Sequence, residues 1–311
     1  MAILYNYFNI NHHIWIFWKK SIYILSILTM KKFIINCSVF SIIIILIHLF
    51  FAFIADESTS DYYAKVSSGQ KKSLVLGTSR AFQALIPEKV DSVLGYENRQ
   101  LFNFAFTIES SPFGKVYYHA IERKLLKKSH DGYFIVTISP WSISQERNSL
   151  SNVNDVQSVL YNLRGVNSKP NMEYLFKKYP YGWGYILFKK IELSFLLSNI
   201  KRLNSNFNGS FSVVESNGWL NVYTSLDSSF VKKKEEKKFT VYKTISKEKV
   251  FSNIRYNYLI KTIDLLNKYG KVYLVRLPVH KKMLEIEKKY MPDFDSKIRT
   301  AKIKCDGFLD M

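Results

Sequence analysis

The chain has 311 residues, of which 47% are apolar, so it can bury the core of one large domain or of two small ones. Lys and Arg outnumber Asp and Glu by 45 to 25, which gives a formal net charge of +20. This balance suits anionic partners such as nucleic acid, lipid headgroups or acidic glycans. The excess is dispersed among Ile, Asn, Phe and Tyr, however, which is also what the codons of an AT-rich genome give. With two cysteines, no CxxC and no Cys/His cluster, the sequence indicates neither a disulfide framework nor a zinc site, and it predicts no metal or cofactor.

Residues 33–54 form an apolar run that contains no Asp, Glu, Lys or Arg. At about 1.5 Å per residue this run is long enough to cross a bilayer. Two lysines precede it and two acidic residues follow it, so the positive-inside rule places the N-terminus in the cytoplasm and the rest of the chain outside. A buried core helix and a cleaved signal peptide are the alternatives. The length and the lack of an A-x-A site favour an uncleaved, single-pass anchor over residues 30–55, in the cell inner membrane.

Residues 1–29 are apolar and aromatic, but Asn, His and Lys interrupt them, which makes them a poor second membrane span. Met30, followed by two lysines and an apolar run, is how a bacterial export signal begins. We therefore expect translation to start at Met30 and residues 1–29 to be an extension that the native protein lacks. On this interpretation His12 and His13 are not metal ligands.

The rest of the chain begins with a polar segment rich in small residues, which predicts a juxtamembrane linker over residues 56–72. Short apolar runs then alternate with segments of helical periodicity. Strands are expected at 73–77, 101–106, 132–140 and 271–278, and residues 304–311 can begin another. Helices are expected at 84–94, 114–129 and 253–270. Residues 145–250 break this rhythm and are expected to be an insertion into one domain, with the charge run at 232–238 on a solvated loop or helix face.

Strands that alternate with helices predict the α/β class, with a mostly parallel sheet covered on both faces. Ligands of such sheets bind beyond the carboxyl ends of the strands. The segments that follow those ends are therefore the places to look for a site: residues 77–80, 103–107, 139–142 and 276–280.

Ser79 stands at the first of these strand ends, in the sequence Gly77-Thr78-Ser79-Arg80. A serine at the start of a helix lies near unpaired backbone N–H groups, which can stabilise an oxyanion. The same position also makes a good helix N-cap, so both interpretations stay open for these four residues. Neither GxxxxGK[ST] nor GxGxxG is present here, which gives no support to a phosphate loop.

Three blocks in order, LGTSRAFQALIPEKV, FNFAF and IVTISPWSIS, resemble the SGNH/GDSL hydrolase superfamily, and more narrowly its membrane-anchored cell-envelope branch. The resemblance covers about residues 73–144 and resumes over about 251–311. It implies a three-layer α/β/α sandwich for residues 73–311. It also implies an acyl esterase or acyltransferase that acts on a cell-envelope glycan, acylated or acidic, and needs no cofactor.

The resemblance assigns roles to individual residues. Ser79 matches the nucleophile, and its backbone N–H and that of Arg80 face the oxyanion. Asn103 matches the side-chain donor of the second block, whereas Ser139 and Trp141 match the pocket lining of the third. The asparagine usual in that third block is absent.

The general base of the superfamily is a His in an Asp-x-x-His block near the C-terminus. Asp310 matches the Asp of that block, with a surface Asp as the alternative, and the sequence stops one residue later. A serine is a weak nucleophile without an adjacent base. We expect a C-terminally truncated domain with impaired activity; the alternative is a degenerate member that binds without turnover.

Two further residues follow the strand expected at 271–278. Arg276 can grip an anionic group of a substrate, or form a structural ion pair. His280 is the one histidine placed to approach the pocket, with a surface loop as the alternative. The alternative function, from another class, is a non-catalytic, membrane-anchored envelope protein that binds glycan or a partner. The outward topology disfavours nucleic acid.

Overall fold

The computed structural model describes residues 2–54, 62–95, 100–110, 113–147, 159–167, 171, 191 and 210–311. The chain divides into two compact units, Met1–Ile54 and Ala55–Met311. Between residues 148 and 209, most of the expected insertion lies outside the described residues. Residues 56–61 of the expected linker also lie outside them.

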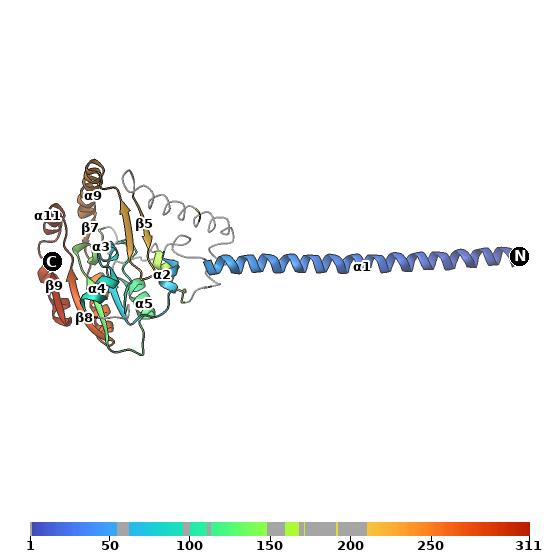
Figure 1. The fold of residues 1–311 in the computed structure, drawn as a ribbon, viewed down its shortest axis with the longest axis horizontal. Helices are drawn as coiled ribbons and strands as arrows, with labels where there is room; N and C mark the ends of the chain where they lie inside the picture. Colours follow the sequence, from blue (N-terminus) through green and yellow to red (C-terminus); the bar gives the residue numbers. More distant parts are fainter. Residues whose placement is uncertain are drawn as a thin grey trace. The chain divides into compact units, whose positions relative to one another are not determined.

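The first unit is the single helix α1 (Ala2–Ile54), which continues through Met30 without a break (Figure 1). Its stretch Thr29–Phe50 has a mean hydropathy of 2.5 and none of its most apolar window is buried by protein. By length and composition this stretch can cross a membrane. The whole helix would measure about 80 Å, which exceeds the thickness of a bilayer core.

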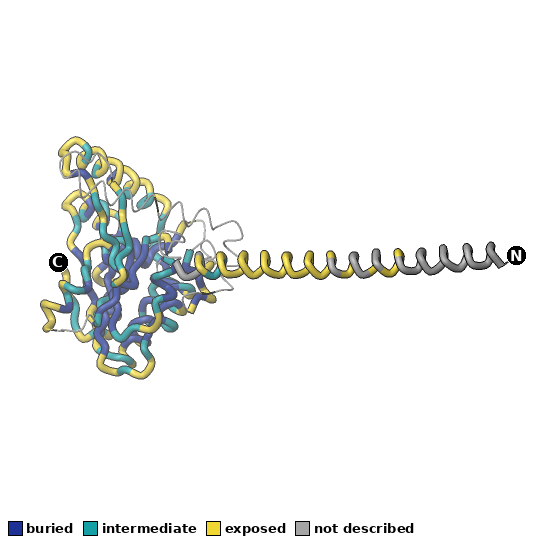
Figure 2. The backbone as a smooth tube through the Cα atoms, turned by 45° about the vertical axis from the view of Figure 1, so that its right-hand side comes forward, coloured by how far each residue is buried: buried dark blue, intermediate teal, exposed yellow. Residues whose placement is uncertain are grey.

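The second unit is built on a five-stranded sheet in the order β2-β1-β3-β8-β9, in which every neighbouring pair is parallel. The strands are β1 (Ser73–Leu76), β2 (Leu101–Asn103), β3 (Gly132–Thr137), β8 (Gly270–Arg276) and β9 (Gly307–Asp310). Burial concentrates in these central strands (Figure 2), and all four residues of β1 have no exposed surface. This confirms the α/β class and the parallel sheet, whose inner strands are continuous apolar runs because both of their faces are covered.

The helices of this unit are shorter than their sequence pattern predicts. The helix expected at 84–94 is α4 (Pro87–Val93), and a separate short helix, α3 (Ser79–Ala84), precedes it. They separate because Pro87 restricts the preceding residue to an extended backbone and suits the first position of the second helix. The other helices are α5 (Lys115–Lys124), α10 (Asn253–Leu266), α11 (Lys281–Tyr290), α12 (Phe294–Lys297) and α13 (Arg299–Lys304).

The two ends of the expected insertion meet each other. Strand β4 (Ser144–Glu146) pairs antiparallel with β7 (Lys249–Phe251), so the chain leaves the sheet and returns at one place. Between them lie α6 (Val159–Asn162), the hairpin of β5 (Ser210–Val214) with β6 (Leu220–Thr224), and α9 (Ser228–Glu248). The charge run at 232–238 lies on α9, and most of its side chains are exposed.

The turn of the β5–β6 hairpin docks on the edge of the parallel sheet. The backbone N–H of Asn103 donates to the carbonyl of Asn217 (2.9 Å), and the indole of Trp219 donates to the carbonyl of Gln83 (2.8 Å). Gly218 has a φ of +83°, and a Cβ there would come within 2.2 Å of the Asn103 carbonyl oxygen. The close approach therefore requires glycine.

The segment expected to be a linker is part of the fold from residue 62 onward, so the linker prediction is wrong over 62–72. Helix α2 (Tyr63–Ser67) is buried in the second unit. Its Lys65 is 2% exposed, donates to the carbonyls of Ala105 (2.6 Å) and Gly218 (2.8 Å), and lies over the ring of Phe82. A charged residue in a polar segment gives no sign of burial, because its partners come from distant parts of the chain.

Replacing Lys65 by Met is expected to lower the free energy of unfolding by about 2–3 kcal/mol. The apolar stem stays, but two buried carbonyl groups lose a charged donor. Urea titration of the full chain in a non-ionic detergent, followed by tryptophan fluorescence, measures the change. Lys89→Met, at an exposed position of α4, is the matched control and should change the value by less than about 0.5 kcal/mol. Equal effects of the two substitutions would contradict this role of Lys65.

Candidate functional site

The carboxyl end of β1 is held in a turn that depends on Gly77. This residue has a φ of +141°, and a Cβ would come within 1.9 Å of the Thr137 hydroxyl oxygen. Its N–H donates to the hydroxyl of Tyr117 (3.1 Å), which in turn donates to the carbonyl of Phe104 (2.8 Å). Burial raises the pKa of Tyr117, so its hydroxyl stays protonated at pH values well above those at which a tyrosine usually ionises. The turn before Ser79 is thus fixed by residues from β3 and from the segment that follows β2.

Ser79 is the first residue of α3, and the N-cap position falls on Thr78, which has an extended backbone. The N-cap interpretation therefore belongs to Thr78 rather than to Ser79. The Ser79 side chain is half-buried, and among the described residues its hydroxyl has no hydrogen-bond partner. A hydroxyl so placed is accessible to a ligand at this edge of the sheet.

Asn103 is fully buried and does not face such a ligand. Its side-chain amide donates to the carbonyls of Ala81 (2.9 Å) and Leu85 (3.0 Å), and its Oδ1 accepts from the N–H of Ala105 (3.1 Å). Both amide hydrogens are thus used on the last turn of α3, where helix carbonyls lack intrahelical partners. The expectation that Asn103 donates to an oxyanion is not met; the side chain instead fixes α3 to β2.

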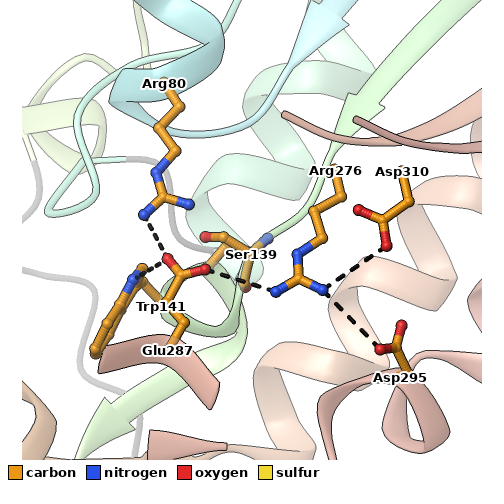
Figure 3. A network of polar contacts seen from close by, with 8 residues as sticks. Arg80, Ser139, Trp141, Arg276, Glu287, Asp295 and Asp310 are labelled. Carbon is orange, nitrogen blue, oxygen red and sulfur yellow. Dashed lines mark hydrogen bonds and ion pairs between the residues drawn. The ribbon is translucent and has the colours of Figure 1, made fainter. Parts of the chain in front are cut away.

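Three of the other expected site residues meet around one buried carboxylate, that of Glu287 on α11 (Figure 3). Glu287 is 1% exposed, and its Oε1 accepts from a guanidinium N–H of Arg80 and from the indole N–H of Trp141 (2.6 Å). Its Oε2 lies 3.8 Å from Nη2 of Arg276. A carboxylate with so little solvent is stable as an ion only because cations and hydrogen-bond donors surround it.

The second arginine extends this network to the end of the sheet. Nη1 of Arg276 lies 3.9 Å from Oδ2 of Asp310 and 4.0 Å from Oδ2 of Asp295. Arg276 and Asp310 are register partners on β8 and β9, and the guanidinium also lies over the ring of Phe294. Arg276 thus bridges acidic groups on three elements. This confirms the structural ion pair that the sequence offered as the alternative role of Arg276.

Trp141 lies in the 3₁₀ helix η1 (Pro140–Ile143), which follows β3. Its ring is 1% exposed, stacks on Tyr290 at 4.7 Å and meets the edge of Tyr242 at 5.1 Å. Burial raises the pKa of Tyr242, and nearby Arg80 partly offsets this. Ser139 caps the same turn: its N–H donates to the hydroxyl of Ser142 (3.1 Å), and that hydroxyl donates to the carbonyl of Ser139 (2.7 Å). Both expected pocket residues therefore lie beside the network, with Trp141 in direct contact.

His280 does not reach this network in the structure. Its Nδ1 accepts from the N–H of Lys282 (3.2 Å) at the start of α11, and its Nε2 lies 3.1 Å from Oε1 of Glu235 on α9. The ring also packs against Phe239. The contacts of His280 thus join α9 to α11, and its approach to the pocket stays a prediction. No group of three or more His, Cys, Asp and Glu side chains within the described ranges could hold a metal ion.

Glu287 is the residue that sequence reasoning missed. It lies in the run Lys281–Lys289, where charged side chains alternate with a few apolar ones and the pattern is typical of a solvated helix. Its four-residue spacing from buried Met283 places it on the inward face of α11, whereas Glu285 is exposed. A single sequence cannot separate these two glutamates, because the cations that bury Glu287 come from α3 and β8.

Substitution of Gly77 by Ala is expected to lower the free energy of unfolding by more than about 3 kcal/mol, because it combines a strained backbone with a steric clash. Gly95→Ala is the control: its φ of +73° is also positive, but nothing lies within 4 Å of the added Cβ. That substitution should cost only about 1 kcal/mol. Denaturant titration of the full chain in detergent measures both, and similar losses would show that the contact with Thr137 does not matter.

Substitution of Glu287 by Gln is expected to lower the free energy of unfolding by about 3 kcal/mol, because the two guanidinium groups lose the carboxylate between them. Glu285→Gln, an exposed position on the same helix, should change it by less than about 0.5 kcal/mol. The emission of Trp141, whose indole donates to Glu287, should also shift in the first variant only. An unchanged stability of Glu287→Gln at neutral pH would refute the role of this charge.

The sequence was also compared with known proteins. No family model matches the chain, and no curated protein or solved structure matches it significantly. What the site can do therefore has to follow from its own geometry.

Proposed function

We propose that the second unit carries an acyl-transfer site of the SGNH type, with Ser79 as its nucleophile. One observation carries this proposal. In the strand order β2-β1-β3-β8-β9, the chain adds β2 on one side of β1 and then adds β3, β8 and β9 on the other side. The switch point of the topology therefore lies between β1 and β3. In open parallel sheets ligands bind beyond the strand ends at such a switch point. Ser79 follows β1, and Ser139 with Trp141 follows β3. The three-layer sandwich implied by the sequence resemblance is part of the same proposal.

In the proposed reaction, Oγ of Ser79 attacks the carbonyl carbon of an acyl ester. A bond forms between Oγ and that carbon, the carbonyl oxygen takes the negative charge, and the backbone N–H groups at the start of α3 stabilise it. The ester bond then breaks, and the alcohol leaves with a proton. Water or a sugar hydroxyl takes the acyl group from Ser79 in the second half. Arg80, held in place by Glu287, adds positive charge beside the reacting atoms.

The step that this chain supports poorly is removal of the proton from Ser79. A serine needs an adjacent base, and His280 binds Glu235 instead. Asp310 lies at the same edge of the sheet but is bound to Arg276. None of the described residues is placed as a base at Ser79, so we expect slow turnover. Ser79 would still react once with a strong electrophile.

The proposal includes a location. Helix α1 would cross the membrane once, with Lys31 and Lys32 on the cytoplasmic side, and the second unit would lie outside the inner membrane. A domain held there meets cell-envelope glycans, which are the substrates that the sequence resemblance implies.

A second candidate function is binding without turnover, as in a degenerate member of the family. The engagement of Asn103 favours it, because both amide hydrogens that would stabilise an oxyanion are used on the carbonyls of Ala81 and Leu85. On this reading the protein would hold a glycan or a partner, and Ser79 would contribute only a hydrogen bond.

Two measurements on the full chain in detergent test the acyl-transfer site. A fluorophosphonate probe in large excess is expected to phosphonylate Ser79 once per molecule, slowly over a long incubation because the serine lacks a base. Peptide mapping by mass spectrometry locates the adduct. Hydrolysis of p-nitrophenyl acetate should stay near the uncatalysed rate, because a serine without its base loses most of its reactivity. Ser92→Ala, at an exposed position of α4, is the matched control and should be labelled like the unmodified chain, whereas Ser79→Ala should not be labelled.

Labelling that is absent, or that persists in Ser79→Ala, would refute Ser79 as a nucleophile. Rapid hydrolysis that disappears in Ser79→Ala would refute the expected impairment and would call for a base that the described residues do not supply.

A further inference from the structure

A pocket of about 1140 Å³ lies outside the network just described, in the groove between α9, β7 and α11. This volume exceeds the range of about 300–1,000 Å³ that is usual for small-molecule sites. We call it the basic groove, because seven of its lining side chains are cationic and three are acidic. Five of these cations have no carboxylate of a described residue within ion-pair distance: Arg147, Lys243, Lys247, Lys282 and Lys289.

Unpaired cations that converge on one concave surface repel each other, and an anion bound among them relieves that repulsion. Lys249 and Lys297 are the exceptions in this groove, since they lie 3.5 Å from Glu146 and 2.5 Å from Asp293. Lysine is a compact point charge on a flexible stem, which suits several separate carboxylate or phosphate groups better than one planar anion. The groove is thus built for a ligand with negative charges spread along its length.

The aromatic side chains of the groove argue against nucleic acid as that ligand. Single-stranded nucleic acids stack their bases on open aromatic rings. Here Lys282 lies over the ring of Phe239, Lys297 lies over the ring of Phe251, and Tyr290 stacks on Trp141. Because these rings already have partners, the groove offers charges more than stacking platforms.

We propose that the basic groove binds a sugar chain that carries repeated carboxylate or phosphate groups. The anionic chemistry follows from the groove itself. The choice of a sugar chain rests on the proposed function, which places the unit among envelope glycans. Tyr290 connects the two places, because it lines the groove and stacks on Trp141, whose indole donates to Glu287. A chain bound in the groove would therefore lie next to the residues that hold Arg80 beside Ser79.

The test is fluorescence anisotropy of a labelled oligogalacturonate with the full chain in a non-ionic detergent. We expect saturable binding that weakens at least about tenfold between 50 and 200 mM NaCl, since five unpaired cations take part. The double variant Lys243→Gln/Lys289→Gln should weaken binding at least about fivefold, because two charged contacts with the ligand are lost. The control pair Lys232→Gln/Lys233→Gln removes the same charge from exposed positions of α9 that do not line the groove, and should change affinity less than twofold.

Three competitors identify the ligand. A neutral maltooligosaccharide of the same length should not compete. Tripolyphosphate that competes better than unlabelled oligogalacturonate assigns phosphate as the anionic group of the chain, and weaker competition assigns carboxylate; both agree with the proposal. Single-stranded DNA that binds more tightly than the oligogalacturonate would overturn it, as would equal losses in the two double variants.

The same titration with Ser79→Ala separates this inference from the acyl-transfer proposal. Binding should be unchanged, because Ser79 does not line the groove. Unlabelled Ser79 together with intact binding would refute only the nucleophile, whereas labelled Ser79 with no binding by the groove would refute only the groove.

Discussion

The carboxylate of Glu287 lies where three strand ends of the sheet meet. It accepts from Arg80 after β1 and from Trp141 after β3, and it lies beside Arg276 at the end of β8. An ion this well buried is costly to desolvate, so its presence is tolerable only with both guanidinium groups close by. The consequence is that α3, η1, β8 and α11 can take only arrangements in which these charges meet. The shape of the candidate site therefore depends on one residue of α11.

Two buried lysines, Lys65 and Lys124, stabilise another part of the second unit in a similar way. The ammonium of Lys65 is held by two carbonyl groups and two aromatic rings, and that of Lys124 donates to the carbonyls of Val66 and Gly69. These contacts fix the segment that follows α1 in the chain to the sheet and to the β5–β6 turn. Part of the large positive charge is thus structural, whereas five of the seven cations of the basic groove have no carboxylate partner among the described residues and remain available for a ligand.

The two proposals place different demands on the same fold. Attack by Ser79 needs a base and oxyanion donors, and the structure commits His280 and Asn103 to other contacts. Binding in the basic groove needs only the unpaired lysines, which are exposed and already in position. Trp141 and Tyr290 lie between the two places, so a ligand in the groove and a reaction at Ser79 would share one wall.

The sequence by itself determined that part of α1 has a composition able to span a membrane, that the fold is α/β, and where along the chain the strands and the strand ends of the candidate site lie. These features are local, because a 3.6-residue period, a short apolar run and a glycine at a tight turn are visible in neighbouring residues. Only the tertiary structure decided that the side chain of Asn103 binds α3, that most of α2 is buried and that Glu287 contacts both arginines. Each of these depends on side chains far apart in the chain: Lys65 meets Gly218, and Arg80 meets Glu287. A lysine or a glutamate in a polar run has the same local pattern whether it is solvated or buried, and the difference lies entirely in the charges and carbonyl groups that folding brings to it.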